Sequence, residues 1–444
     1  MSTVLAEAQT TLPEYRKTSR RVVTRRAVMW LGQTCNLRCH FCYFLDRIDD
    51  HEHPEHAFMD VEKAKQICTA LVEHYGNNSI DIQGGEPTIW KGIYELVRHC
   101  RDIGLVPTLI TNALALSKKD ICVRLKEAGL RDLLISVQGL GETYDRIVQT
   151  KGAYEKQKRG IENAIAVGIP LRFNCVLSKP ALPQLKEIAE YAVACKVRVV
   201  NFLAFNPFED QQLQGKRSDV NVPRYTEVAA VLNEALDILE AAGIEANVRY
   251  FPLCMVAPRH RKSIYNFQQL PYDVHEWDYA SWSWTGQQPQ RMKWGEVSEL
   301  VDLGKVTFEQ ARYAGPLKHV ANGVRSLVHF YPKMRAPAAS VHRTISKLVH
   351  LNKPASPADA SAQELLYREN ARMRASSHCR YEYSEACGKC AARDICDGFH
   401  GDYAALFGSD EARPIQDVAK ITDPKFFIRE QQKVVEPEDY GWAL

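Results

Sequence analysis

The sequence lacks the marks of a membrane protein and of a secreted one. It has no run of about 18 consecutive apolar residues, and no basic-then-apolar leader opens it. Charge of one sign is not in excess either, because 57 Lys and Arg stand against 54 Asp and Glu, a formal net charge of +3. We therefore expect a cytoplasmic protein, and no global electrostatic field favours a membrane surface or nucleic acid as its partner.

Cysteine is the residue that is present in unusual number. The chain of 444 residues holds 13 cysteines, an odd count in a chain much longer than a small disulfide-bonded domain. This excludes a secreted disulfide scaffold. A reducing compartment, in which some of the cysteines are kept as thiolates for metal, is the better interpretation.

Residues 28–254 alternate between strand-like and helical patterns. The strand-like runs are rich in Val, Ile and Leu, as strands buried on both faces are; they cover 28–34, 79–85, 106–112, 132–139, 170–178 and 197–205. Amphipathic patterns such as 59–76 separate them, Ser117 is a candidate helix N-cap, and 245–253 is a candidate seventh strand. Repeats of this kind predict a parallel α/β sheet, either an open doubly wound sheet or a partial barrel. The active edge is then formed by the carboxyl ends of the strands.

We divide the chain into an N-terminal extension, the barrel, a connecting segment and a Cys-rich domain with its tail: 1–27, 28–254, 255–370 and 371–444. The connecting segment is first aromatic, with Trp277, Trp282 and Trp284 as candidates for a lid over the substrate or for the core of the segment itself. It then becomes basic, since 310–358 has no Asp or Glu. That stretch fits a phosphorylated small molecule, a carrier protein or an acidic peptide, or is a solvated helix face.

Cys35, Cys39 and Cys42 directly follow the first strand-like run and are the strongest local motif. Three thiolates within eight residues of a loop cannot stack on one helical face, but they can surround one inorganic cluster. A zinc ion would need a fourth ligand close by, and His40 or His51 would supply it at a spacing foreign to zinc fingers. Three cysteines on a four-iron cluster would leave one iron open to a reactive ligand.

This spacing resembles that of the radical S-adenosylmethionine (SAM) superfamily, where CxxxCxxC follows the first strand of a repeated βα chain. The resemblance implies a partial (β/α)6 barrel of the α/β class. It further implies that Cys35, Cys39 and Cys42 hold a 4Fe–4S cluster whose open iron binds SAM. Phe41, the aromatic residue before the third cysteine, is then expected to pack near the adenine.

The end of the second strand-like run carries a second part of the resemblance. Gly84, Gly85, Glu86 and Pro87 match the GGEP motif of the family, which contacts the methionine amino group of SAM. Glycine allows close approach of the backbone, and a carboxylate or carbonyl oxygen accepts a hydrogen bond from an ammonium group. These four residues are therefore expected in the cofactor site.

Later strand ends supply weaker candidates for SAM contacts: Asn112, Ser136, Gln138 and Asn174. Ser136 and Gln138 stand in SVQG, where the family often has SxDG, so the contact made by the glutamine stays open. Each of the four could equally be a loop residue with partners inside the protein.

A second cysteine cluster holds Cys387, Cys390 and Cys396. CxxC with a third cysteine six positions on indicates metal, and a zinc knuckle is an alternative. The segment resembles the C-terminal SPASM or twitch extensions of radical SAM enzymes, which bind auxiliary 4Fe–4S clusters. The fourth ligand is then Cys379 by proximity or Cys254 by resemblance.

One auxiliary cluster is expected, because His400 stands where a full SPASM domain has a further cysteine and no cysteine follows Cys396. Gly398, Phe399 and Tyr403 stand where such extensions have glycine, an aromatic residue and tyrosine. The remaining cysteines are expected to be small buried hydrophobic residues: Cys68, Cys100, Cys122, Cys175 and Cys195.

The resemblance implies an enzyme that cleaves SAM reductively to a 5′-deoxyadenosyl radical, which removes a hydrogen atom from its substrate. The expected role is biosynthesis or modification of a natural product or peptide, with a flavodoxin- or ferredoxin-type protein as electron donor. A protein maturase or a transferase of a SAM fragment would use the same clusters. The alternative of another class is a zinc-stabilised nucleic-acid-binding protein.

Overall fold

The structure is a computed structural model, and it describes residues 26–42, 44–53, 56–75, 77–204, 218–273, 278–282, 379–416 and 418–434. Within these ranges we find no helix with the length and apolar character that crossing a membrane requires. The predicted basic segment 310–358 lies outside the described residues, as do Trp277 and Trp284.

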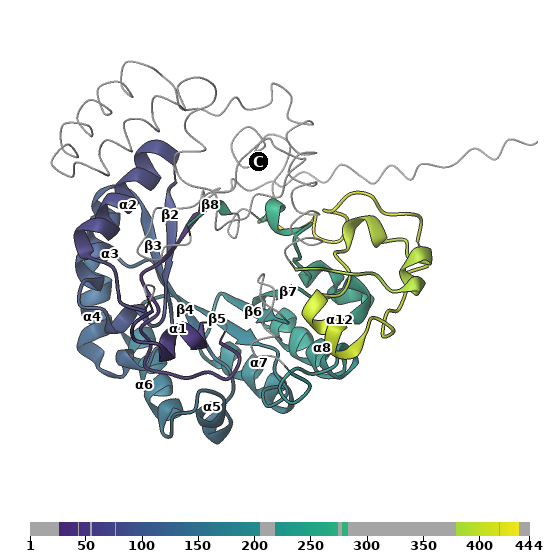
Figure 1. Cartoon of the computed structure of the whole chain (residues 1–444), viewed down its shortest axis with the longest axis horizontal. Helices are drawn as coiled ribbons and strands as arrows, with labels where there is room; N and C mark the ends of the chain where they lie inside the picture. Colours follow the sequence, from purple (N-terminus) through teal and green to yellow (C-terminus); the bar gives the residue numbers. More distant parts are fainter. Residues whose placement is uncertain are drawn as a thin grey trace, which may run out of the picture.

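A single parallel sheet of eight strands forms the centre of the molecule. It curls into a partial barrel with the strand order β7-β6-β5-β4-β3-β2-β1-β8 (Figure 1). The strands are β1 Arg26–Trp30, β2 Ser79–Gln83, β3 Val106–Thr111, β4 Asp132–Ser136, β5 Leu171–Val176, β6 Val199–Leu203, β7 Glu245–Arg249 and β8 Asp278–Trp282. The predicted partial barrel is confirmed, and so is the seventh strand.

The eighth strand is a finding that the sequence did not predict. β8 lies in the aromatic segment and pairs in parallel with the outer side of β1, with Trp282 opposite Met29. Strand and helix patterns are hard to distinguish in a short segment dominated by aromatic residues, so its sequence gave no clear period.

Helices cover the outer face of the curled sheet (Figure 1). The longer ones are α2 Val61–Tyr75, α3 Ile93–Asp102, α4 Lys119–Ala128, α6 Ala153–Val167, α7 Leu185–Ala194 and α8 Tyr225–Ala241. Short helices are α1 Leu45–Asp49, α5 Gly141–Ile147 and α12 Gly401–Phe407. Alternate strand residues such as Ile80, Leu109 and Phe173 are buried in one apolar core with these helices.

Two boundary predictions need correction. The predicted strands ended one to four residues past the observed ends, because apolar residues such as Leu31 and Val137 continue, fully buried, into the loops that follow. Ser117 was expected to cap α4, but it ends a 3-10 turn over Ala115–Ser117, and Lys118 takes the N-cap position without a side-chain bond. A serine that ends one turn was thus mistaken for the N-cap of the helix that follows.

A group of charged side chains lies inside the curled sheet. Asp81 on β2 and Arg172 on β5 approach to 3.7 Å although β3 and β4 lie between their strands, so the sheet curls enough for them to meet inside it. Arg26 donates to Asp81 at 2.7 Å, and Arg172 lies 3.2 Å from Asp132. All four are less than 10% exposed, which makes this a buried ion network.

The described part of the C-terminal lobe, residues 379–434, packs beside α8 and β7 (Figure 1). Tyr403 stacks on Tyr225 of α8, with ring centroids 3.7 Å apart, and accepts a hydrogen bond from the Tyr225 backbone at 2.8 Å. Lys433 lies at the N-terminal end of β7, where it donates to Glu245 at 2.6 Å and lies 3.1 Å from Asp273. The lobe and the barrel therefore share one core.

Candidate active site and the second cysteine cluster

The loop that carries the first three cysteines follows β1 and is held by α5. The backbone N–H groups of Arg38 and His40 each donate at 3.2 Å to the last carbonyls of that helical region, at Val148 and Ile147. Below the loop lies a small apolar core of its own. Phe41, 9% exposed, is part of this core, together with Leu37, Leu114, Tyr144, Ile147 and Val148.

The three thiols lie close enough to influence one another. Burial raises the pKa of Cys35 to about 12, and the nearby charges of Glu86 and Cys42 add to the rise. Burial also holds the pKa of Cys39 well above its usual range, and the neighbouring Cys42 and Cys35 reinforce this. A positive centre bound between the three thiols would lower these pKa values and favour thiolates, which is the chemistry of a metal cluster site.

The GGEP segment runs directly beside the start of the cysteine loop. Gly85 donates its N–H to the Gly32 carbonyl at 2.7 Å, and Glu86 donates to the Thr34 carbonyl at 2.9 Å. A Cβ atom at Gly85 would lie 2.0 Å from the Thr34 carbonyl oxygen, which no side chain permits. Gly84 has a φ of +153°, in the range that favours glycine. The glycines therefore bring the end of β2 against the cysteine loop.

The Glu86 carboxylate is buried and ties β2 to β3. It accepts hydrogen bonds from the Thr88 backbone at 3.0 Å, the Thr111 hydroxyl at 2.6 Å and the Asn112 backbone at 2.7 Å. Burial raises the pKa of Glu86 in spite of these donors. Pro87 begins the 3-10 turn Pro87–Ile89 that follows, where its fixed φ suits the first position.

Asn112 links this strand edge to the cysteine loop. Its side-chain Nδ2 donates to Asn36 Oδ1 at 2.8 Å, and Asn36 directly follows Cys35. Asn36 was not among the predicted site residues, since a loop asparagine carries no signal in a single sequence. Asn112 itself was predicted as a SAM contact, and the structure gives its side chain partners inside the protein.

The ends of β4 and β5 lie side by side. Ser136 and Asn174 are opposite one another in the register and are partly exposed. Gln138 is buried, and its Oε1 accepts a hydrogen bond from the Val176 backbone at 2.7 Å. Gln157 of α6, which the sequence did not single out, donates from Nε2 to the carbonyls of Asn112 and Ser136, each at 2.9 Å.

The last inward-facing residue of most strands lies at the mouth of the barrel. Side chains alternate between the faces of a strand, so the residue two positions beyond Asp81 or Arg172 also points inward. These last inward residues are all partly exposed: Trp30, Gln83, Ile110, Ser136, Asn174, Leu203 and Arg249. They form an accessible lining above the buried ion network.

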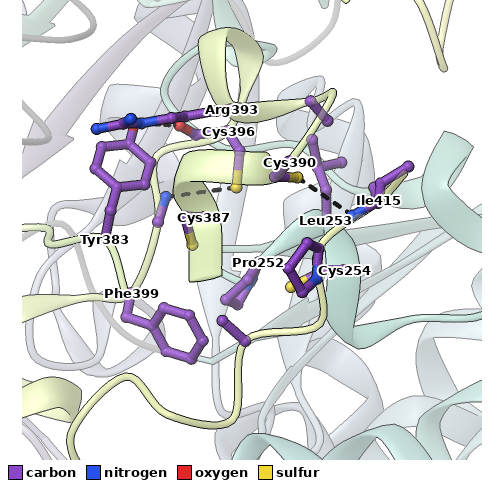
Figure 2. Close-up of a pocket in the computed structure, with 14 residues that line it drawn as sticks. Pro252, Leu253, Cys254, Tyr383, Cys387, Cys390, Arg393, Cys396, Phe399 and Ile415 are labelled. Atoms are coloured by element: carbon purple, nitrogen blue, oxygen red, sulfur yellow. Dashed lines mark hydrogen bonds between the residues drawn. The ribbon is translucent and has the colours of Figure 1, made fainter. Parts of the chain in front are cut away.

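The second group of cysteines surrounds one hollow, shown in Figure 2. Cys254, Cys387, Cys390 and Cys396 line it, together with Phe399 and Tyr383 among others. Cys379 is absent from this lining and is buried, 1% exposed, in the core beside it. Of the two alternatives for a fourth member, the structure brings Cys254 to the other three.

Backbone N–H groups point at these sulfur atoms. Ile415 donates to Cys390 Sγ and Gly398 to Cys396 Sγ, both at 3.4 Å (Figure 2). Burial raises the pKa of Cys254, while a backbone hydrogen bond from Arg413 opposes the rise. Donors aimed at three of the four sulfurs suit a group whose negative charge rests on thiolates.

The hollow is lined by the four cysteines and is partly open to solvent. A zinc ion and an iron–sulfur cluster can each be held by four cysteine thiolates, so the donor set fits either group.

The other cysteines take no part in either group. All 13 lie in described residues, and none forms a disulfide. Cys68 and Cys100 are fully buried between α2 and α3 with their sulfurs 3.6 Å apart.

Trp282 ends β8, and only its backbone is described.

Residues 31–199 match the Radical SAM superfamily. A probable GTP 3′,8-cyclase of Sulfurisphaera tokodaii is 26% identical over 50% of this chain and 67% of its own length. An AdoMet-dependent heme synthase of Oleidesulfovibrio alaskensis is 30% identical over 37% of this chain and 41% of its own length. A GTP 3′,8-cyclase of Peptoclostridium acidaminophilum is 38% identical over 32% of this chain and 43% of its own length. The matched part of the chain thus spans between about two fifths and two thirds of the length of these curated relatives.

Two solved structures resemble the fold. Streptococcus suis SuiB bound to S-adenosylmethionine gives a TM-score of 0.43 at 18% identity, over 51% of this chain and 50% of that one. Native anSMEcpe with bound AdoMet and Cp18Cys peptide gives a TM-score of 0.44 at 14% identity, over 65% and 80%.

Proposed function

Residues 31–199 form a radical SAM domain, which belongs to a superfamily of enzymes, and from this premise we propose that the protein cleaves SAM reductively. The cluster held by Cys35, Cys39 and Cys42 would supply the electron that releases methionine and a 5′-deoxyadenosyl radical from SAM. The radical then takes a hydrogen atom from a C–H bond of the substrate.

One observation carries the proposal. The three thiols of the cysteine loop and the GGEP segment, far apart in the sequence, lie against each other at one edge of the sheet, joined by the hydrogen bonds of Gly85 and Glu86. This is the juxtaposition that binding SAM beside a cluster requires. The Gly84–Gly85 backbone offers carbonyl oxygens to an ammonium group, while the Glu86 carboxylate holds the segment in place.

The residues at the barrel mouth are proposed to orient SAM and the substrate. Ser136 and Asn174 offer a hydroxyl and an amide to the ribose, and Phe41 supports the adenine from the apolar core below the loop. The buried ion network lies inside the curled sheet beneath them and is proposed to limit the access of water to a reactive radical. Trp277, Trp282 and Trp284 remain candidates for covering the substrate.

The second hollow is proposed to hold one auxiliary 4Fe–4S cluster on Cys254, Cys387, Cys390 and Cys396. Four thiols and several N–H donors around one space support this assignment over Cys379. With four protein ligands, the cluster would exchange electrons and would bind no substrate. A flavodoxin- or ferredoxin-type protein is the proposed electron donor.

The proposed role is biosynthesis or modification of a natural product or peptide. The test is direct: protein reconstituted anaerobically with iron and sulfide is incubated with SAM and dithionite, and 5′-deoxyadenosine is measured. We expect the nucleoside from the unmodified chain and none from Cys35→Ala. Cys195→Ala is the matched control, because that cysteine lies outside both groups.

Two outcomes would lead elsewhere. A colourless protein with stoichiometric zinc and no 5′-deoxyadenosine would contradict the proposal and favour the zinc-stabilised alternative. Formation of 5′-deoxyadenosine together with transfer of a SAM fragment, or modification of a folded protein, would keep the clusters and change the reaction class.

A further inference from the structure

We infer that Asn112 is a positioning residue that acts on the cysteine loop through Asn36, and that it makes no direct contact with SAM. This inference rests on the proposed function of the first site. It assigns to the end of β3 the task of fixing the cysteine loop relative to the GGEP segment.

The hydrogen bond between the two asparagines carries the inference. Asn112 Nδ2 donates to Asn36 Oδ1 at 2.8 Å, which is a short, well-formed bond between neutral groups. Asn36 lies between Cys35 and Leu37, and the Leu37 backbone donates to Cys35 Sγ at 3.5 Å. Whatever fixes the Asn36 side chain therefore limits the freedom of the first cysteine of the motif.

Asn112 is itself held on every side. Its backbone N–H donates to Glu86 at 2.7 Å, its carbonyl accepts from Gln157 at 2.9 Å, and its Oδ1 accepts from the Leu114 backbone at 3.0 Å. It is 8% exposed. With each of its four kinds of polar group engaged by the protein, it is rigid enough to orient Asn36 and poorly placed to bind a cofactor.

The network joins the two halves of the SAM site. Glu86 fixes the end of the GGEP segment to β3, and Asn112 fixes β3 to the cysteine loop. Asn36, by contrast, is an exposed loop residue, and its Oδ1 also accepts a long hydrogen bond from the Cys35 thiol at 3.9 Å. Breaking this link would leave the cluster ligands present and their distance from the GGEP backbone less well defined, which costs affinity.

The test is a double-mutant cycle of Asn36→Ala, Asn112→Ala and the combined variant. Each reconstituted protein is reduced and titrated with SAM, and the change in the electron paramagnetic resonance spectrum of the cluster gives the apparent Kd. We expect each single change to weaken SAM binding about three- to tenfold, the range for one hydrogen bond. The combined variant should bind SAM no more weakly than the single variant with the larger loss, because both changes remove the same hydrogen bond.

Losses that multiply in the combined variant would overturn the inference, since they would mean that the two side chains act independently. Asn163→Ala is the matched control: that side chain donates to the carbonyls of Leu116 and Ser117, away from the loop. It should leave the SAM-induced spectrum unchanged. If Asn163→Ala weakened SAM binding as much as Asn112→Ala, the inference would also be overturned.

If a variant does not take up iron, the same cycle is measured on the apo chain by chemical denaturation. Non-additive changes in the unfolding free energy support the link, and additive ones contradict it. Failure of the proposed function looks different, because the unmodified protein would then show no SAM-induced spectral change at all.

Discussion

Cys254, in the 3-10 turn Leu253–Met255 that follows β7, and Cys390, in the C-terminal lobe, line the same hollow, whereas Cys379 lies buried outside its lining. The lobe reaches β7 because Tyr403 and Lys433 anchor it on α8 and on the N-terminal end of the strand. Proximity along the chain would have favoured Cys379, and packing of the lobe brings Cys254 instead.

The first prediction separates these two cysteines. Cys254→Ala should lower the iron content from about eight atoms per chain to about four, the content of one four-iron cluster. Cys379→Ala should keep the full content and lose only stability, because it removes a buried apolar atom. Iron and acid-labile sulfide are measured on anaerobically reconstituted protein. Loss of iron in Cys379→Ala alone would reverse the assignment.

The second prediction concerns the close approach at Gly85. Gly85→Ala forces the Thr34 carbonyl to move, since the new Cβ would lie 2.0 Å from its oxygen. We expect a loss of about 1–3 kcal/mol in unfolding free energy, as for overpacked sites, together with weaker SAM binding. Gly388→Ala is the control, because nothing lies within 4 Å of a Cβ there. Equal effects of the two changes in denaturation would contradict the prediction.

A third prediction follows from the ion network inside the barrel. Burial alone would raise the pKa of Asp132, but Arg172 and Arg131, with a hydrogen bond from Thr108, hold it below its ordinary value. Such a carboxylate stabilises the fold above the unfolded-state pKa of about 3.9, and this contribution is lost as the pH falls through the lowered folded pKa.

Asp132→Asn should therefore reduce stability at neutral pH by about 2 kcal/mol, the value of a charged hydrogen bond. Its unfolding free energy should fall less steeply than that of the unmodified chain below about pH 4. Urea denaturation at a series of pH values measures both effects. Parallel curves for the two proteins in acid would show that Asp132 does not titrate as described.

The fourth prediction tests the anchor of the C-terminal segment. Burial alone would lower the pKa of Lys433, yet the carboxylates of Asp273 and Glu245 hold it above its usual range. Lys433→Met removes the cation that lies 3.1 Å from the buried Asp273 carboxylate, so we expect a loss of about 3 kcal/mol in unfolding free energy.

The ion pair of the exposed Lys420 with the partly exposed Asp394 provides the control, since Lys420→Met should change stability by less than about 1 kcal/mol. Adding Asp273→Asn to Lys433→Met should restore part of the loss by removing the buried charge. No recovery in that combined variant would mean that the lysine stabilises the segment by packing alone.

The sequence predicted those features that depend on local order. The apolar runs predicted the parallel strands β1 to β7, because buried strands need continuous Val, Ile and Leu. The spacing of Cys35, Cys39 and Cys42 indicated a metal loop after β1, since ligands within one loop need no tertiary contact to be neighbours. The GGEP glycines were likewise predicted to approach other backbone closely.

Contacts between distant segments were decided only by the tertiary structure. The curl of the sheet brings Asp81 to Arg172, the packing of the lobe brings Cys254 to Cys390, and the β3 edge brings Asn112 to Asn36. Only the pairing of Cys254 with Cys390 was indicated by the sequence, as one of two alternatives that the resemblance left open. The other pairs carry no signal in one sequence, because side chains far apart along the chain meet only after the elements between them have packed. The sequence thus indicated the chemistry of the site, and the tertiary structure determined which residues position it.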